Sequence, residues 1–177
     1  MTVRELNDKD RGGFVEAVGW VFENSPWVAE RAWDRRPFAS IDALHDAMVA
    51  AVAAATLDEQ LTLLRAHPDL GALGSAPRTG TGVGPVSEAS TREQTGAGLD
   101  SLTTEELDRL RALNVTYQDK FGFPFLYAVK GRTKHEVLNA IERRLTSTRD
   151  AEMQEALRQV YRIARFRLDE CFGSAGL

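Results

Sequence analysis

Cysteine is almost missing from this chain of 177 residues, with Cys171 as its single instance. An internal disulfide is therefore impossible, a paired-cysteine metal site is excluded, and nothing points to an oxidising compartment. Long apolar runs are missing as well. The longest candidate, residues 48–55, is far short of the roughly 18 residues that a membrane span needs. Because the start of the sequence lacks the apolar stretch of a signal peptide, we expect a cytoplasmic protein without a membrane partner.

Charge of one sign is not in large excess, since the formal net charge is −4. A nucleic-acid partner is therefore not expected. Hydrophobic residues make up 43% of the chain and charged residues 27%, a balance typical of a globular protein that can bury a core. No repeat and no linker divides the chain. The sequence predicts a single domain over residues 1–177.

Histidine is also rare. His45 lies within a helical pattern and His135 follows the start of another, whereas His67 stands at the end of a helix. No two of them have the His-x-x-x-His spacing of a zinc site. The acidic residues lie mostly at helix caps or on polar faces, so we expect no metal.

Helical periodicity dominates what is present. Capping boxes, in which a threonine is followed three residues later by a glutamate, begin at Thr56 and Thr133. The pattern predicts an all-α domain of about seven or eight helices. We expect them over residues 8–23, 26–35, 40–52, 56–67, from Ser87 or Ser90 onward, 103–117, 133–145 and 148–172.

Two stretches interrupt the helical pattern. Residues 71–86 contain five glycines and two prolines, and a loop of this length is more often functional than plain. Residues 121–129, Phe-Gly-Phe-Pro-Phe-Leu-Tyr-Ala-Val, form one extended apolar segment. Its main-chain groups need hydrogen-bond partners. Either helix ends and water, or the polar edge of a bound heterocycle, could supply them.

His67 lies between an apolar helical pattern and the Gly-rich loop. The next residue, Pro68, fixes its own φ and pushes His67 toward extended geometry. The imidazole should therefore leave the helix in one preferred direction, as a catalytic histidine aimed into a cleft would. A capping or packed histidine is the alternative, because a local motif is only a hypothesis.

Ser90, Glu93 and Gln94 stand together in the stretch Ser-Thr-Arg-Glu-Gln. Ser90 and Glu93 have the spacing of a capping box, which is a purely structural role. Glu93 and Gln94 also offer two acceptors and an amide donor pair. That combination suits a urea-like or imide-like ligand with adjacent N–H and C=O groups, so both interpretations stay open.

Arg167 falls between Ile163 and Val160 on the wheel of the last helix, whereas Arg165 falls on the other side. Arg167 is therefore the arginine expected to point inward. A buried arginine needs an anionic partner, because an unpaired buried charge is expensive. Either a substrate carboxylate or a carboxylate of the protein would serve.

Five stretches of the chain form a recognisable series when they are taken in order. They are residues 20–38, the His-Pro-Asp-Leu-Gly of 67–71, the Ser-x-x-Glu-Gln of 90–94, the Phe-Gly-Phe-Pro-Phe of 121–125, and Arg167-Leu168. Each is weak alone, whereas five with plausible spacing are specific. Together they make nearly the whole chain resemble the 2-oxo-4-hydroxy-4-carboxy-5-ureidoimidazoline (OHCU) decarboxylases of urate catabolism.

The resemblance implies an all-α homodimer that needs neither cofactor nor metal. Its small-molecule substrate would be OHCU, the unstable product of 5-hydroxyisourate hydrolysis, and loss of CO2 would give (S)-allantoin. The implied site consists of His67 as the acid/base residue, Glu93, Gln94 and Arg167 holding the substrate, Pro68 and Ser90 shaping the site, and the backbone of Phe125, Leu126, Tyr127, Ala128 and Val129 closing it.

Two other classes of protein have to be weighed against an enzyme. His-Pro-Asp at residues 67–69 is also the signature of a J-domain co-chaperone, but the helix before that signature is strongly basic, whereas residues 57–61 are acidic and neutral. A non-catalytic helical binding module would expose a large apolar patch. An enzyme instead predicts that His67, Glu93 and Arg167 converge on one site.

Overall fold

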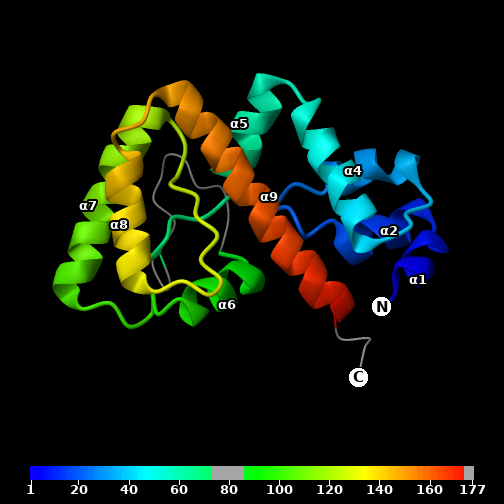
Figure 1. The fold of residues 1–177 in the computed structure, drawn as a ribbon, viewed down its shortest axis with the longest axis horizontal. Coiled ribbons are helices and arrows are strands. Elements are labelled where there is room, and N and C mark those ends of the chain that lie inside the picture. The colour runs from blue at the N-terminus through cyan, green and yellow to red at the C-terminus, as the bar shows by residue number, and fades with distance from the viewer. Residues whose placement is uncertain (73–85, 174–177) are drawn as a thin grey trace. The chain divides into compact units, whose positions relative to one another are not determined.

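Helices account for the regular structure of this protein. The computed structural model describes residues 1–72 and 86–173, and in these ranges it contains nine α-helices, one short 3-10 helix (η1) and no strand. The elements are α1 Val3–Asn7, α2 Arg11–Val18, α3 Trp27–Ala32, η1 Trp33–Arg35, α4 Ile41–Ala53, α5 Leu57–Arg65, α6 Glu88–Gly96, α7 Thr104–Phe121, α8 Lys134–Arg144 and α9 Arg149–Gly173 (Figure 1). The all-α prediction is confirmed. Most of the predicted Gly-rich loop at 71–86 lies outside the described residues.

The helix predicted over residues 8–23 is wrong in extent. Two short helices, α1 and α2, stand at the N-terminus instead, and the second begins where the Asp10 side chain accepts a hydrogen bond from the Gly13 N–H at 2.8 Å. Helix α2 ends at Val18, although Val21 and Phe22 beyond it are buried. Tertiary packing buries these two apolar residues in a turn, and their spacing therefore imitates a longer helix.

The chain divides into two compact units. The first comprises residues 1–63 together with the chain from Tyr161, and the second comprises residues 64–160. Helix α9 therefore contributes its first half to the second unit and its remainder to the first. That the whole chain forms a single domain stays a prediction.

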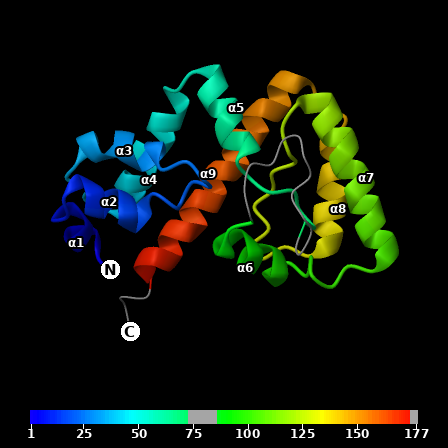
Figure 2. The same cartoon turned by 180° about the vertical axis from the view of Figure 1, so that it is seen from behind.

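The first unit is built on helices α2, α3 and α4. Helix α3 contacts both α2 and α4 (Figure 2). The ring of Phe14 lies 5.4 Å from that of Trp33 and 6.0 Å from that of Phe38. His45 of α4 places its Nε2 atom 2.9 Å from the carbonyl oxygen of Tyr161 in α9. His45 is therefore a packing histidine, in keeping with its place in a helical pattern.

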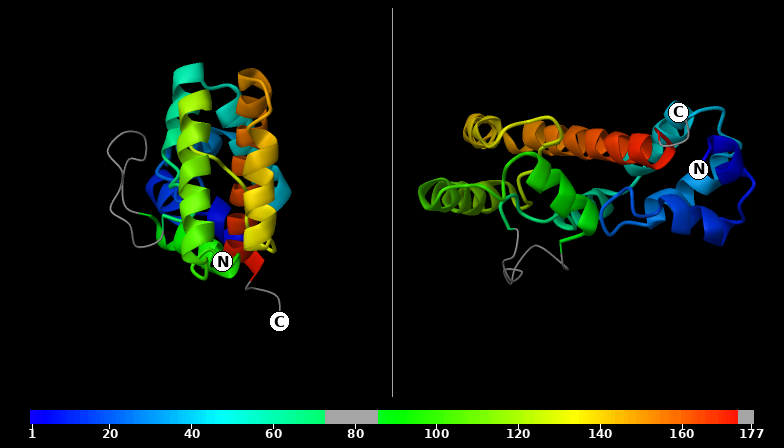
Figure 3. Two further views of the ribbon diagram at one scale, coloured as in Figure 1. Left: turned by 90° about the vertical axis from the view of Figure 1, so that its left-hand side faces the viewer. Right: turned by 90° about the horizontal axis from the view of Figure 1, so that it is seen from below.

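Helices α7 and α8 form the frame of the second unit. They run side by side in the same direction, so the connection between them must return along their length (Figure 3). Lys134 pairs with Glu106 at 2.6 Å near the start of both helices, and Lys120 donates to the Leu145 carbonyl at 2.5 Å near the end of both. The return is made by residues 122–133, which contain the predicted extended apolar segment except for Phe121, the last residue of α7.

The aromatic residues of this segment pack on Tyr117 of α7. The Tyr117 ring lies 4.6 Å from the ring of Phe121, 6.1 Å from that of Phe123 and 5.3 Å from that of Phe125. All four side chains are buried. Helix α7 can end immediately before Gly122 because this glycine has a φ of +81°, the left-handed region in which a side chain would be strained.

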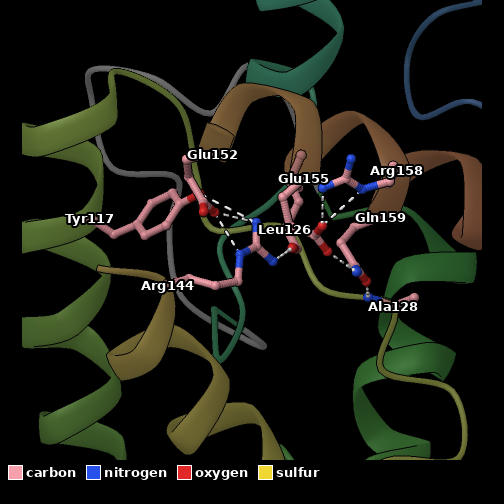
Figure 4. A network of polar contacts seen from close by, with 8 residues as sticks. All are labelled: Tyr117, Leu126, Ala128, Arg144, Glu152, Glu155, Arg158 and Gln159. Carbon is pink, nitrogen blue, oxygen red and sulfur yellow. Dashed lines mark hydrogen bonds and ion pairs between the residues drawn. The ribbon is translucent and has the colours of Figure 1, made fainter. Parts of the chain in front are cut away.

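Buried polar side chains support the backbone of the same segment. Arg144 of α8 donates to the Leu126 carbonyl at 2.5 Å, and its Nε lies 2.6 Å from an oxygen of Glu152, with which it forms an ion pair (Figure 4). The Tyr117 hydroxyl donates to the same carboxylate. Burial, together with that hydrogen bond, raises the pKa of the Tyr117 phenol. The phenol therefore stays a donor at any ordinary pH.

A second support lies further along α9. The Gln159 side chain accepts a hydrogen bond from the Ala128 N–H at 2.9 Å, and its amide nitrogen donates to Glu155 at 2.6 Å (Figure 4). Arg158 completes this group from the exposed side, at 2.7 Å from Glu155. Side chains of α8 and α9 thus supply hydrogen-bond partners for the irregular main chain at Leu126 and Ala128.

None of the single helices in residues 1–72 and 86–173 has the length and apolar character to cross a membrane. The pair α4 and α5, bent by 116°, meets that test by length and composition.

Removal of the buried carboxylate is the change that tests this support. Glu152→Ala leaves the Arg144 guanidinium buried without its anion, so we expect a loss of about 3–5 kcal/mol in the free energy of unfolding. Arg158→Ala breaks an exposed pair on the same helix and should cost no more than about 1 kcal/mol. Urea unfolding of both variants checks the difference. Equal losses would mean that the buried pair contributes nothing beyond a surface contact.

Candidate functional site

His67 stands two residues beyond the end of α5. The predicted capping box starts this helix, because the Thr56 N–H donates to Glu59 at 2.8 Å and the Glu59 N–H donates back to the Thr56 hydroxyl at 3.3 Å. The His67 N–H closes a final turn on the Leu64 carbonyl at 3.3 Å. His67 is 4% exposed, and Pro68 beside it is half-buried. The histidine is therefore held inside the second unit at the point where the helix gives way to irregular backbone.

A hydrogen bond joins the two predicted motifs of this unit. The Gly71 N–H donates to the side-chain oxygen of Gln94 in α6 at 2.9 Å, and this contact is buried. Gly71 closes the His-Pro-Asp-Leu-Gly stretch, and Gln94 closes the Ser-x-x-Glu-Gln stretch. The structure thus brings together residues that lie 23 positions apart in the sequence.

Two side chains of α7 form hydrogen bonds with Asp69 and Leu70, the two residues that precede Gly71. The Asn114 side-chain amide donates to the Leu70 carbonyl at 2.9 Å, and the Gln118 amide donates to the Asp69 carboxylate at 2.5 Å. Sequence reasoning missed both amides. The signal was available, since polar residues four positions apart on the apolar face of a helix call for buried partners.

Helix α6 presents Ser90, Glu93 and Gln94 on one face, as their spacing requires. The N-cap of this helix is Ser87, whose hydroxyl accepts from the Ser90 N–H at 3.1 Å. The capping-box interpretation of Ser90 and Glu93 is therefore wrong. Ser90 is buried and Glu93 is half-buried.

The side chain of Gln94 is oriented by its contact with Gly71. Because a backbone N–H only donates, the oxygen of Gln94 must face it. The Nε2 group then points away from the Gly71 N–H. Gln94 is 2% exposed, so its side chain is held inside the second unit.

In the segment from Phe125 to Val129, some residues form main-chain hydrogen bonds with the described part of the protein and others do not. Leu126, Ala128 and Val129 each place one group in a hydrogen bond, to Arg144, to Gln159 and to Arg132 respectively. The main-chain groups of Phe125 and Tyr127 form no hydrogen bond to any residue that the structure describes. The Phe125 ring is buried and stacks on the half-buried Tyr127 ring at 6.0 Å.

Arg167 belongs to the first unit, whereas the other predicted site residues belong to the second. It is 1% exposed, and its Nη1 atom lies 2.9 Å from Glu23 and 3.3 Å from the Val21 carbonyl. Arg165 is more exposed and pairs with Asp42 and Asp169. Arg167 is thus the inward-facing arginine, as expected, and Glu23 is a buried partner that sequence reasoning missed.

No group of three or more His, Cys, Asp or Glu side chains in residues 1–72 and 86–173 is arranged to hold a metal ion.

Known proteins provide the context for this arrangement. The family model described as OHCU decarboxylase matches residues 7–169. An OHCU decarboxylase from Halalkalicoccus jeotgali is 46% identical over 170 residues, which cover 96% of this chain and 91% of the relative. The chain therefore belongs to the OHCU decarboxylase family, and the co-chaperone and binding-module interpretations are set aside.

Solved structures agree with this assignment. A crystal structure of (S)-allantoin synthase has a TM-score of 0.77 at 34% identity, covering 97% of this chain and 54% of that one. A crystal structure of an OHCU decarboxylase in the presence of (S)-allantoin has a TM-score of 0.67 at 25% identity, covering 86% of this chain and 95% of that one.

Gly71 offers a test of how closely the histidine stretch is packed. Its φ is +80°, and an added Cβ would lie 2.8 Å from Cδ2 of Leu110 in α7. Gly131 has a similar φ of +75° with nothing within 4 Å of the added atom, so it is a matched control for backbone strain alone. We expect Gly71→Ala to lose about 1–3 kcal/mol more unfolding free energy than Gly131→Ala. Chemical denaturation measures the difference, and equal losses would show that Leu110 moves aside without cost.

Proposed function

We propose that His67, Glu93, Gln94 and Arg167 carry out the reaction of the OHCU decarboxylases in this protein. Family membership makes the protein a carboxy-lyase that converts OHCU to allantoin in urate degradation. The observation that supports the residue roles best is the buried hydrogen bond from Gly71 to Gln94, because it places the histidine stretch against the Ser-x-x-Glu-Gln stretch.

The chemistry asks for positioning and proton transfer. When the bond to the carboxyl carbon breaks and CO2 leaves, the bonding electrons remain on the ring carbon. The C=N bond of the substrate's own imidazoline ring can accept them, which gives an enol across the two ring carbons. The enol hydroxyl then loses its proton to become the ring carbonyl, and a proton must be added to the neighbouring, ureido-bearing carbon. The protein therefore has to bind, orient and protonate on one face. Stereospecific protonation, giving (S)-allantoin, is what we propose to distinguish the enzyme from spontaneous decay.

His67 is the proposed acid/base residue. A neutral imidazole can accept the proton of the substrate hydroxyl as the carboxylate leaves. Glu93, on the face of α6 that also carries Gln94, can fix the imidazole tautomer or hold the ureido N–H. The burial of His67 supports this role, since exclusion of water strengthens each of these polar contacts.

The proposed binding groups complement a urea-like molecule. The Nε2 of Gln94 offers amide N–H donors to a carbonyl oxygen, while its oxygen is held by Gly71. The main-chain groups of Phe125 and Tyr127 are suited to a heterocycle's polar edge. Within the same segment we assign Leu126, Ala128 and Val129 to the wall of the site, and Pro68 and Ser90 to its shape.

Arg167 is the proposed partner of the substrate's carboxylate. Its charge is opposed by Glu23 in the first unit. A guanidinium has five N–H donors in a planar fork, so it can bind one carboxylate of the protein and a second from a ligand. We further propose a homodimer, which rests on the resemblance to the family, and a cytoplasmic location, which rests on the sequence.

Replacement of His67 tests the central role. We expect His67→Gln to lower kcat about 10²- to 10⁴-fold, the usual contribution of a positioned acid/base group. Urate is fed through urate oxidase and hydroxyisourate hydrolase, and circular dichroism follows the appearance of optically active allantoin. His45→Gln, which alters a packing histidine in the first unit, is the matched control. Full rate and stereospecificity in His67→Gln would refute the assignment.

The role of Arg167 can be separated from its ion pair. Arg167→Gln alone leaves Glu23 buried without its cation and should cost about 3–5 kcal/mol of unfolding free energy. Arg167→Gln combined with Glu23→Gln removes both charges and should recover most of that loss. If Arg167 holds the substrate, kcat/KM of this double variant falls about 10- to 100-fold, the worth of a charged hydrogen bond.

Glu23→Gln alone keeps the arginine and should retain more activity than the double variant. A stable double variant with the kcat/KM of the unaltered protein would remove Arg167 from the binding machinery.

A further inference from the structure

We propose that Asn114 and Gln118 of α7 are positioning residues of this enzyme. With Gln94 of α6, they form what we call the amide clamp, three side-chain amides that hold Asp69, Leu70 and Gly71 in place. The clamp keeps His67 where it can transfer a proton. This inference rests on the proposed role of His67.

Each residue of the stretch is held by its own amide. Gln118 donates to the Asp69 carboxylate, and Asn114 donates to the Leu70 carbonyl. Gln94 accepts from the Gly71 N–H at 2.9 Å. A carbonyl oxygen only accepts, so the amide nitrogen of Asn114 must face it, and the orientation of that side chain is defined. Three consecutive residues are thereby fixed from two helices.

The two amides of α7 lie on one face of the helix because they are four residues apart. Leu110, one turn earlier, packs on Gly71, where an added Cβ would meet its side chain at 2.8 Å. The same helix face therefore touches the stretch with one leucine and two amides. Such a row restrains the backbone along its length, whereas a single contact would leave it free to pivot.

The burial of Asn114 lowers the stability of the folded protein, so packing alone does not explain this residue. The side chain is 5% exposed, and its Oδ1 atom is buried with no hydrogen-bond partner among the described residues. A buried polar atom without a partner destabilises the folded state, and an apolar residue of the same shape would avoid that cost. The bond to Leu70 is therefore better explained by positioning than by stability.

The clamp acts on His67 through a short, stiff connection. Only Pro68 separates the histidine from Asp69, and the ring of proline fixes its φ. A displacement of the clamped residues is therefore passed on to the imidazole. A shift of about 1 Å in a reacting group can cost roughly 100-fold in rate. Loss of the clamp should thus lower kcat far more than it changes KM.

The first experiment replaces Asn114 with an apolar residue of similar volume. We expect Asn114→Leu to lower kcat about 10- to 100-fold while KM stays within about threefold. Asn7→Leu is the matched control, because Asn7 also donates its amide to a main-chain carbonyl, that of Phe38 at 2.8 Å, but in the first unit. Equal effects of the two variants, or an effect on KM alone, would overturn the proposal.

A second experiment exchanges the partners of one clamp bond. Gln118→Glu sets two carboxylates against each other and should lower kcat about tenfold or more. Adding Asp69→Asn restores a donor and an acceptor with their places reversed, so the double variant should regain activity over Gln118→Glu. The effects of Gln118→Glu alone and of Asp69→Asn alone together predict the kcat of the double variant if the two changes act independently. If the double variant has that low kcat, the contact between Asp69 and Gln118 does not position the histidine.

Hydrogen exchange separates the clamp from the role of His67. In the folded protein, the Gly71 amide should exchange about 10-fold faster in Asn114→Leu than in Asn7→Leu, because a loosened stretch opens more often. This readout needs no substrate. Faster exchange with an unaltered kcat would confirm a clamp that does not serve catalysis. Unaltered exchange and kcat would refute the clamp, whatever His67→Gln shows.

Discussion

The buried pair of Arg144 and Glu152 is the interaction on which the second unit depends. Parallel helices such as α7 and α8 need a return segment, and residues 123–126 of this one are buried, so their main-chain groups need partners within the protein. Arg144 satisfies the Leu126 carbonyl while Glu152 balances its charge. A buried pair is a weak source of stability by itself. Its effect here is to define the path of the backbone that we propose as part of the substrate site.

The same physical problem is solved with neutral groups beside His67. Where α5 ends, Gln94, Asn114 and Gln118 bind Gly71 and the residues before it through amides. Amides can satisfy polar groups without adding a further charge next to the imidazole that we propose to exchange protons. The return segment thus has charged support, whereas the histidine stretch has neutral support.

Local signals predicted the helices well where a cap and a periodic face agreed. The capping boxes at Thr56 and Thr133 start α5 and α8 as expected. Prediction failed where two local patterns competed. Ser87 and Ser90 both have the features of an N-cap, and only packing selects Ser87. Residues 8–23 read as one helix because buried turns can have the same apolar spacing as a helical face.

The sequence by itself determined the all-α class, most helix starts and the order of motifs that identifies the family, because helix formation and capping depend on neighbours within a few residues. Only the tertiary structure decided which side chains hold the irregular backbone. The amides that bind residues 69–71 come from 23 to 49 positions away, and the partner of Arg167 is Glu23 near the other end of the chain. No local pattern specifies such partners, since they meet only when the helices pack.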